Sequence, residues 1–178
     1  MSSPASGYPP VVVMGVQGAG KSTIASMLAQ RIGGRYVDGD RLHSAENVAK
    51  MASGIPLTDE DRLPWLHAIG GTLAAEGERG IVVVCSALRR AYRDVLRADA
   101  PDTVFVHLHG SFELIWSRVN ARRHEYMPPS LLRSQFASLE PLQPDEPGIV
   151  LDVADSPPAI VAAAVAFLDE RRAAGRTA

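Results

Sequence analysis

The segment from Gly15 to Thr23 has the residue types and spacing that bind a nucleoside triphosphate. It satisfies the pattern G-x-x-x-x-G-K-[ST], with Lys21 and Ser22 at its end. Glycines let the backbone curl around phosphate groups, Lys21 would reach the β- and γ-phosphates, and the Ser22 hydroxyl would ligate Mg²⁺. We expect ATP to be bound here by Gly15, Gln17, Gly18, Ala19, Gly20, Lys21, Ser22 and Thr23.

Two carboxylates follow the next apolar run of the chain. Asp38 and Asp40 flank Gly39 directly after Arg35–Val37, and ligands of open α/β sheets bind at the carboxyl ends of the strands. Phosphoryl transfer to an alcohol needs one carboxylate that orients the acceptor and one on the metal side. Asp38 and Asp40 can offer these two roles. The alternative is a simple turn made of residues that favour turns.

Other classes of nucleotide-binding protein fit the sequence less well. A GTPase needs a guanine-reading N-K-x-D segment, but Lys50 follows Ala49. Motor and transport ATPases place an acidic residue at the end of a neighbouring strand, whereas the apolar run Ile81–Cys85 leads into Ser86 and Ala87. The D-x-x-G sequence at Asp145–Gly148 lies in a proline-rich loop and is interpreted as a coincidence.

These segments must be positioned by alternating strands and helices. Five short runs are predicted strands: Val11–Met14, Arg35–Val37, Ile81–Cys85, Thr103–Leu108 and Ile149–Val153. The first four are nearly all apolar or β-branched, which predicts strands covered on both faces. The predicted helices are Ser22–Ile32, Glu46–Ala52, Leu63–Glu76, Tyr92–Arg97, Phe112–Arg123, Pro129–Leu139 and Ala159–Arg172. The alternation predicts an α/β fold with a parallel sheet between two helix layers.

Length and composition narrow the class of protein further. The 178 residues suffice for a single domain, with residues 1–9 as a flexible leader and 170–178 as a flexible tail. A net charge of -2 argues against a nucleic-acid partner. We expect no membrane partner, since no apolar run is long enough to span a bilayer. The lone Cys85 and the lack of a secretory signal favour the cytoplasm.

Longer segments carry a resemblance to a known family over about residues 10 to 168. They are Gly39-Asp40, Leu42-His43, Asn47, Lys50-Met51, Gly54, Pro56-Leu57, Asp59, Asp61-Arg62, Pro64-Trp65-Leu66, Cys85-Ser86-Ala87-Leu88-Arg89-Arg90, Tyr92-Arg93-Asp94, Met127-Pro128, Leu131-Leu132 and Ser134-Gln135-Phe136. With them the chain resembles the small P-loop gluconokinases, which are related to shikimate and nucleoside monophosphate kinases.

The resemblance implies a three-layer α/β/α P-loop kinase fold with a five-stranded parallel sheet and a mobile lid at about residues 118–136. It also implies ATP-dependent phosphorylation of gluconate on its 6-hydroxyl with Mg²⁺, and frequent homodimers. One stretch departs from the family pattern. Glu125 stands where the lid usually has a histidine, and His124 lies one place earlier. This departure concerns lid contacts and leaves the reaction class unchanged.

The resemblance assigns roles to several side chains. By analogy with shikimate kinases, Asp40 would accept the proton of the 6-hydroxyl and Asp38 would support hydrated Mg²⁺. Gluconate also needs a cation for its carboxylate and partners for its hydroxyls. The candidates on the substrate side are His43, Arg62, Arg89 and Gln135, and Arg118 and Arg122 would close on the phosphates from the lid. Lys21, Asp40, Arg89 and Arg122 form the predicted catalytic set.

Simpler roles stay open for some of these residues. His43 could be a surface histidine, and Arg62 could pair with Asp59 or Asp61 at a helix start. We expect Trp65 to be core or pocket wall and Cys85 to act as a small hydrophobe. Lys50 could pair with Glu46 or line the pocket. Arg90, Arg93 and Arg97 are predicted to be solvated or paired with Asp94 and Asp99.

Three functional hypotheses therefore stand side by side. The first is a gluconate kinase. The second, within the same fold, is a kinase for another small hydroxylated acid such as shikimate, or for a nucleoside monophosphate. The third is a non-catalytic ATP-binding regulator, against which the presence of Lys21, Ser22, Asp38 and Asp40 argues.

Overall fold

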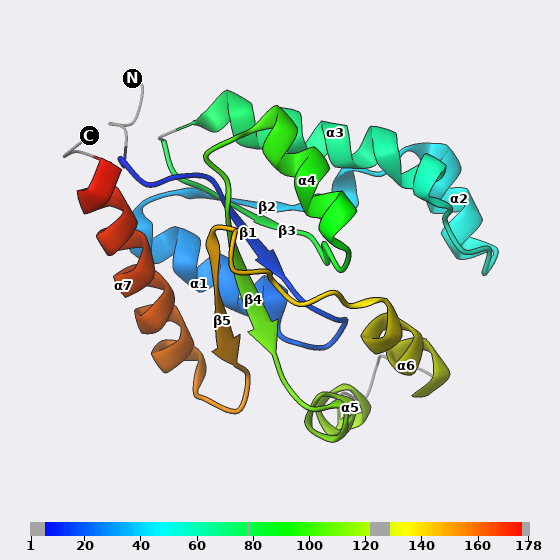
Figure 1. Cartoon of the computed structure of the whole chain (residues 1–178). Coiled ribbons are helices and arrows are strands. Elements are labelled where there is room, and N and C mark those ends of the chain that lie inside the picture. The colour runs from blue at the N-terminus through cyan, green and yellow to red at the C-terminus, as the bar shows by residue number, and fades with distance from the viewer. Residues whose placement is uncertain (1–5, 78, 122–128, 176–178) are drawn as a thin grey trace.

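The computed structural model describes residues 6–77, 79–121 and 129–175 of the chain. Its centre is a sheet of five parallel strands in the order β2-β3-β1-β4-β5 (Figure 1). The strands are β1 Val11–Met14, β2 Arg35–Asp38, β3 Ile81–Val84, β4 Val104–His109 and β5 Gly148–Asp152. All five predicted strands are confirmed within one or two residues at their ends.

Helices cover both faces of this sheet, which confirms the three-layer α/β/α architecture (Figure 1). Helices α1 and α7 contact each other on one face, and α3 and α4 contact each other on the other. The helices are α1 Lys21–Ile32, α2 Ala45–Ala52, α3 Asp59–Glu76, α4 Arg90–Asp99, α5 Phe112–Ala121, α6 Pro129–Ser138 and α7 Pro157–Gly175. A short 3₁₀ helix, η1 Gly39–Leu42, joins β2 to α2.

Alternate side chains of the central strand feed two separate apolar clusters. Val11 and Val13 belong to the cluster under α1 and α7, whereas Val12 and Met14 belong to the cluster under α3 and α4. A parallel strand whose faces are both buried needs this kind of continuous apolar run. The prediction of two covered faces is thus confirmed for β1.

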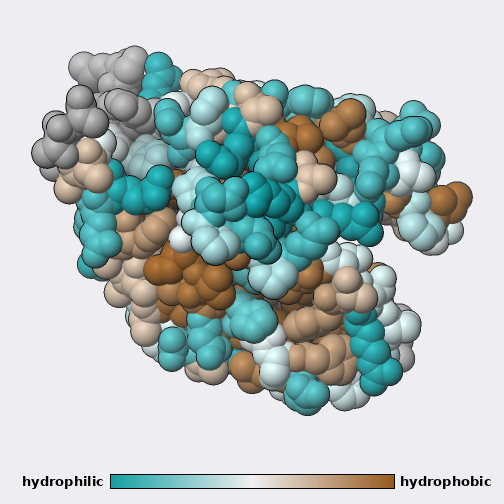
Figure 2. Space-filling model, in the orientation of Figure 1, coloured by the Kyte–Doolittle hydropathy of each residue, from teal (hydrophilic) through white to brown (hydrophobic). Residues whose placement is uncertain are grey.

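The same prediction is wrong for β2, whose residues are all exposed or half-buried. The reason is its place at one edge of the sheet, with β3 as its single strand neighbour. At the other edge lies β5, where Val150 is 51% exposed. Figure 2 shows an apolar area on this face at the position of β5. Short sequence runs cannot distinguish an edge strand from a central one.

Several helices are longer than predicted, and α3 shows why. It begins at Asp59, four residues before the predicted start at Leu63, because Thr58 and Asp61 form a capping box. The Thr58 hydroxyl accepts a hydrogen bond from the Asp61 N–H at 3.1 Å, and the Asp61 carboxylate accepts one from the Thr58 N–H at 2.9 Å. This pair satisfies N–H groups that the first turn leaves without helical partners.

The two ends of the described chain pack against each other. Tyr8, which the sequence placed in a flexible leader, is buried, and its hydroxyl donates to Asp169 of α7 at 2.7 Å. The Arg172 guanidinium lies 4.3 Å from the centre of the Tyr8 ring. Helix α7 also continues to Gly175, so residues 170–175 are helical. Among the described helices, none is long and apolar enough to cross a membrane.

Candidate active site

The glycine-rich loop between β1 and α1 has a conformation that its glycines make possible. Gly15 has a φ of 145°, and a Cβ there would lie 2.7 Å from the Leu108 carbonyl oxygen. Gly18 has a φ of 85°, and a Cβ there would meet the Val119 side chain of α5. The loop is therefore held closely between β4 and α5. At Gly20, the N-cap of α1, no side chain caps the helix, so its first N–H groups can receive an anion.

Lys21 stands at the start of α1 and is half-buried. Its Nζ donates to the Val16 carbonyl at 3.0 Å, so the side chain folds back over its own loop. Burial lowers the pKa of Lys21 to about 8, and the negative charge of Asp40 opposes this shift. The influence of the Asp40 charge on the pKa of Lys21 agrees with a shared region for the acidic pair and the loop.

The acidic pair follows β2 at the same end of the sheet as the loop. Asp38 pairs with Val84 of β3, and β3 lies next to β1. A Cβ on Gly39 would run into the Val84 carbonyl, so only glycine allows this close approach. The Asp38 carboxylate accepts from the Asp40 N–H at 3.1 Å, which fixes the turn. Asp38, Gly39 and Asp40 therefore do form a turn, as the alternative interpretation predicted. The same turn also lies beside the phosphate-binding loop.

Asp40 is exposed to solvent. Its surroundings nevertheless favour the protonated carboxyl group more than bulk water would. Its pKa is raised, first by partial burial of the carboxylate and second by the charge of Asp38. Lys21 and His43 act in the opposite direction. A carboxylate with a raised pKa is a stronger proton acceptor while it remains ionised.

His43 is held in place by a ring stack and is not a free surface residue. Its imidazole lies 4.1 Å from the Trp65 ring, at an interplanar angle of 14°. The Trp65 indole N–H donates to the Gly39 carbonyl at 2.8 Å, which ties this stack to the acidic turn. Asn47 Nδ2 lies 3.4 Å from His43 Nδ1. Burial lowers the pKa of His43, so the ring is neutral near pH 7 and can partner a hydroxyl.

Asp59 gathers two of the predicted arginines from different helices. Arg62 Nη1 lies 3.6 Å from Asp59 Oδ1 and donates to the Leu57 carbonyl at 2.7 Å. Arg89 Nη1 lies 3.9 Å from Asp59 Oδ2, and the Tyr92 hydroxyl donates to Asp59 at 2.6 Å. The ion pair considered for Arg62 is therefore present. The two guanidinium groups form a positive cluster that the sequence could not show.

The remaining predicted residues lie on α5, on α6 or between them. Arg118 Nη1 donates to the Val153 carbonyl at 2.6 Å, beyond the end of β5. Gln135 Oε1 accepts from the Gln17 N–H at 2.6 Å, so its contact in this structure is with the phosphate-binding loop. Arg122 and Glu125 lie outside the described residues, as does His124.

Several charged residues have other partners than the sequence suggested. Lys50 pairs with Asp61 at 2.8 Å rather than with Glu46. The prediction that Arg93 is solvated or paired with its helix neighbours is wrong. Its side chain is completely buried and pairs with Glu146 at 2.6 Å. No local signal reveals this pair, because its members are 53 positions apart.

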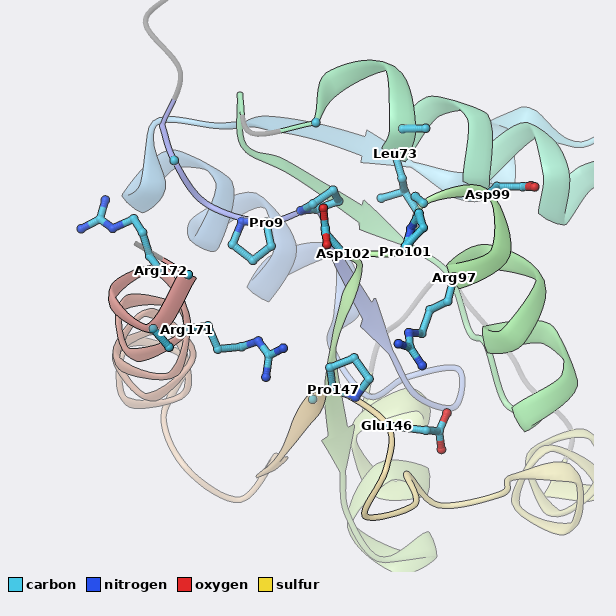
Figure 3. Close-up of a pocket in the computed structure, with 18 of the residues that line it drawn as sticks. Pro9, Leu73, Arg97, Asp99, Pro101, Asp102, Glu146, Pro147, Arg171 and Arg172 are labelled. Atoms are coloured by element: carbon cyan, nitrogen blue, oxygen red, sulfur yellow. The ribbon is translucent and has the colours of Figure 1, made fainter. Parts of the chain in front are cut away.

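A cavity lies away from these residues, at the amino-terminal end of the strands. It measures about 1370 Å³ and is bordered by Pro9 before β1, Asp102 before β4 and Pro147 before β5. Arg97 and Arg171 direct their side chains into it (Figure 3). None of the predicted site residues is among the described residues that line it. Size alone would therefore mislead, because the chemically equipped groups lie at the opposite end of the sheet.

The sheet order, the glycine-lined anion cradle after β1 and the carboxylates after β2 together define a P-loop kinase. Residues 17–163 match the family model described as shikimate kinase. Within this class the chain belongs to the gluconokinase family. It is 45% identical to the thermosensitive gluconokinase of Escherichia coli (strain K12) over 142 residues, which cover 78% of this chain and 75% of that relative.

Two further comparisons agree with this assignment. The chain is 46% identical over 141 residues to a gluconokinase of Gluconobacter oxydans (strain 621H), covering 78% of this chain and 79% of the relative. The crystal structure of a gluconokinase from Sinorhizobium meliloti 1021 superimposes with a TM-score of 0.87 at 43% identity. That comparison covers 95% of this chain and 96% of the other.

Proposed function

We propose that this protein is a gluconokinase that transfers the γ-phosphoryl group of ATP to the 6-hydroxyl of D-gluconate. The products are 6-phospho-D-gluconate and ADP. The observation that carries the proposal is that the glycine-lined cradle with Lys21 and the acidic turn with Asp40 follow parallel strands of one sheet, at the same end of that sheet. Membership of the gluconokinase family supports gluconate as the acceptor.

We assign each step of the transfer to residues of the site. The loop N–H groups and Lys21 hold the phosphates. The 6-oxygen of gluconate bonds to the γ-phosphorus, the bond from that phosphorus to the β–γ bridging oxygen breaks, and Asp40 takes the hydroxyl proton. ADP leaves with the electron pair. Arg118 and Arg122 offset the charge that spreads over the phosphoryl oxygens, and Arg89 acts from the acceptor side.

The acceptor is held by the groups around Asp59 and Trp65. Arg62 and Arg89 offer two guanidinium groups for the gluconate carboxylate, which arginine can bind with parallel hydrogen bonds. The neutral ring of His43 partners a hydroxyl. Gln135 contributes from α6, where it already contacts the loop that holds the nucleotide.

The residues present also fit Mg²⁺. Ser22 and Asp38 supply the hard oxygen donors that this ion prefers, and one or two protein donors suffice because substrate phosphates and water complete its shell. The absence of a cluster of three acidic or histidine ligands among the described residues is therefore compatible with it. When bound, the ion neutralises phosphate charge.

The homodimer and the cytoplasmic location stay predictions from the sequence, as does the single domain. Light scattering on the purified protein would test the homodimer.

Cys85 is free and buried, and burial raises the pKa of its thiol to about 12. Both properties agree with the interpretation of Cys85 as an inert hydrophobe.

The decisive experiment measures ADP release with gluconate, shikimate and AMP as acceptors. We expect turnover with gluconate and little with the other two. Asp40→Asn should lower kcat by about 1000-fold while ADP still binds, because the proton acceptor is lost and the cradle is intact. Asp102→Asn, at the opposite end of the sheet, is the matched control and should leave kcat unchanged. A wild-type protein without gluconate turnover would reject the proposal.

A further inference from the structure

The turn between β3 and α4 is hydrogen-bonded to the phosphate-binding loop and has a strained backbone. Its Ser86 carbonyl accepts from the Gly15 N–H at 3.2 Å. Ala87 has a φ of 44°, and no other described residue apart from glycines has a positive φ. Left-handed backbone is unfavourable for alanine and persists only where surrounding contacts impose it. Something must therefore hold this turn.

The contacts that hold it come from a buried ion pair. Arg93 Nη1 donates to the Ala87 carbonyl at 2.9 Å. The other side of the guanidinium pairs with Glu146, with Nε and Nη2 at 2.6 and 3.0 Å from its oxygens. Both side chains are completely buried. A buried ion pair often adds little stability compared with apolar residues of the same size. This pair is therefore better explained by its effect on the geometry of the turn than by a contribution to stability.

Glu146 is itself fixed by the segment that follows α6. Its carboxylate also accepts from the Gln143 N–H at 2.8 Å. In the same segment, the Glu140 N–H donates to the Leu88 carbonyl at 2.7 Å, and the Glu140 carboxylate accepts from the Arg90 N–H at 2.6 Å. The turn is thus clamped from outside by residues that are far away in the sequence.

Arg89 is the side chain that this clamp places. It is the N-cap residue of α4, two positions after Ala87, and its carbonyl accepts from the Arg93 N–H at 3.3 Å. We propose that the Arg93–Glu146 pair is a positioning device that holds Ala87 in its left-handed conformation and so directs Arg89 toward the substrate. This inference rests on the proposed function, in which Arg89 acts on the acceptor side.

A double-mutant cycle with Arg89 tests the proposal. Glu146→Gln should lower kcat/KM for gluconate by about 30-fold and change the affinity for ADP less than about twofold. In an Arg89→Ala background the same substitution should cost less than about threefold, because the residue it positions is already gone. Equal losses in both backgrounds would overturn the proposal, as would an equal loss of ADP affinity.

A second variant makes the role of the strained turn visible. Ala87→Gly removes the cost of a positive φ, so it should restore at least about fivefold of the kcat/KM lost in Glu146→Gln. Alone it should change kcat/KM by less than about twofold. If Glu146→Gln does not fold, the apolar replacement Arg93→Met with Glu146→Met carries the same test. Failure of the glycine to restore activity would contradict the mechanism.

The exposed pair between Arg90 and Asp145 provides the matched control. It joins the same two segments through two hydrogen bonds of 2.7 and 2.6 Å, but it does not touch Ala87. Asp145→Asn should leave kcat/KM within about twofold of wild type. A failure of the proposed function would be recognised separately, because the wild-type protein would then not phosphorylate gluconate at all.

Discussion

At the scale of single residues, the site works through charges that change each other's pKa. Asp40 is affected by Asp38, Lys21 and His43, which belong to the acidic turn, the cradle and the Trp65 stack. Asp38 raises the pKa of Asp40, whereas Lys21 and His43 lower it. The strength of Asp40 as a proton acceptor is therefore set first by its partial burial and then by these charged neighbours, through which it can be adjusted.

Replacing Asp38 should move the pH dependence of the reaction. Ionised Asp40 accepts a proton and protonated Asp40 does not, so kcat falls as the pH drops through the pKa of Asp40. Asp38→Asn removes a charge that raises this pKa while keeping an oxygen for the Asp40 N–H. We expect the acid limb of the kcat profile to move to lower pH, whatever the height of the plateau.

The profile is measured from about pH 4 to about pH 8, around the range where carboxylates titrate. Asp102→Asn is the control and should keep the wild-type limb. An unmoved limb in Asp38→Asn would show that a group other than Asp40 governs the acid side.

The sequence predicted candidate site residues in the connections that follow predicted strands. Lys21, Ser22, Asp38 and Asp40 are of this kind, since the carboxyl ends of parallel strands meet at one edge of a sheet. Glu146 was missed because a pair between distant residues leaves no local pattern. The convergence of Arg62 and Arg89 on Asp59 was missed for the same reason.

At the scale of elements, two adjacent glycines of α3 show how closely this helix approaches α4. Gly70 is buried, and a Cβ there would lie 2.6 Å from both Cβ and Oδ2 of Asp99. Gly71 is exposed, and a Cβ there would meet nothing within 4 Å. One glycine allows the two helices to touch, whereas the other only weakens α3.

Alanine at these two positions should therefore have opposite effects on stability. Gly71→Ala should raise the free energy of unfolding by about 0.5–1 kcal/mol, the difference in helix propensity. Gly70→Ala should lower it by about 1–3 kcal/mol, because Asp99 and its helix must move away. Urea titration of both variants measures this, each serving as the control for the other. A stabilising Gly70→Ala would mean that α3 and α4 lie further apart.

Element boundaries were harder to predict than element types. Apolar periodicity identified α3 from Leu63 onward, but its first turn consists of charged residues and depends on the Thr58 capping box. Edge position was not predictable either. β2 and β1 both have short runs of strand-forming residues, and only the order of the sheet decides which one is buried on both faces.

At the scale of the whole molecule, the two apolar clusters enclose some polar groups. His107 of β4 is 2% exposed, and neither ring nitrogen has a hydrogen-bond partner among the described residues. Burial lowers its pKa to about 4, with smaller contributions from His109 and Arg93 in the same direction. The native state therefore keeps this ring neutral where the unfolded chain would protonate it.

Stability should consequently fall in mild acid through His107. The pKa of His107 is about 6.5 in the unfolded chain and about 4 in the folded protein. Between these two pH values the unfolded state binds one more proton than the folded state. The stability that neutral His107 contributes above about pH 6.5 is therefore lost as the pH falls through this range. From about pH 7 to about pH 5 this amounts to about 2 kcal/mol.

His107→Leu removes the titrating group and should reduce the loss by that amount. Urea unfolding of both proteins at the two pH values measures the difference, and ionisable groups elsewhere cancel in the comparison. His109→Leu, at an exposed position of the same strand, is the control and should keep most of the wild-type loss. Equal losses in wild type and His107→Leu would mean that the folded protein can protonate His107 at little cost.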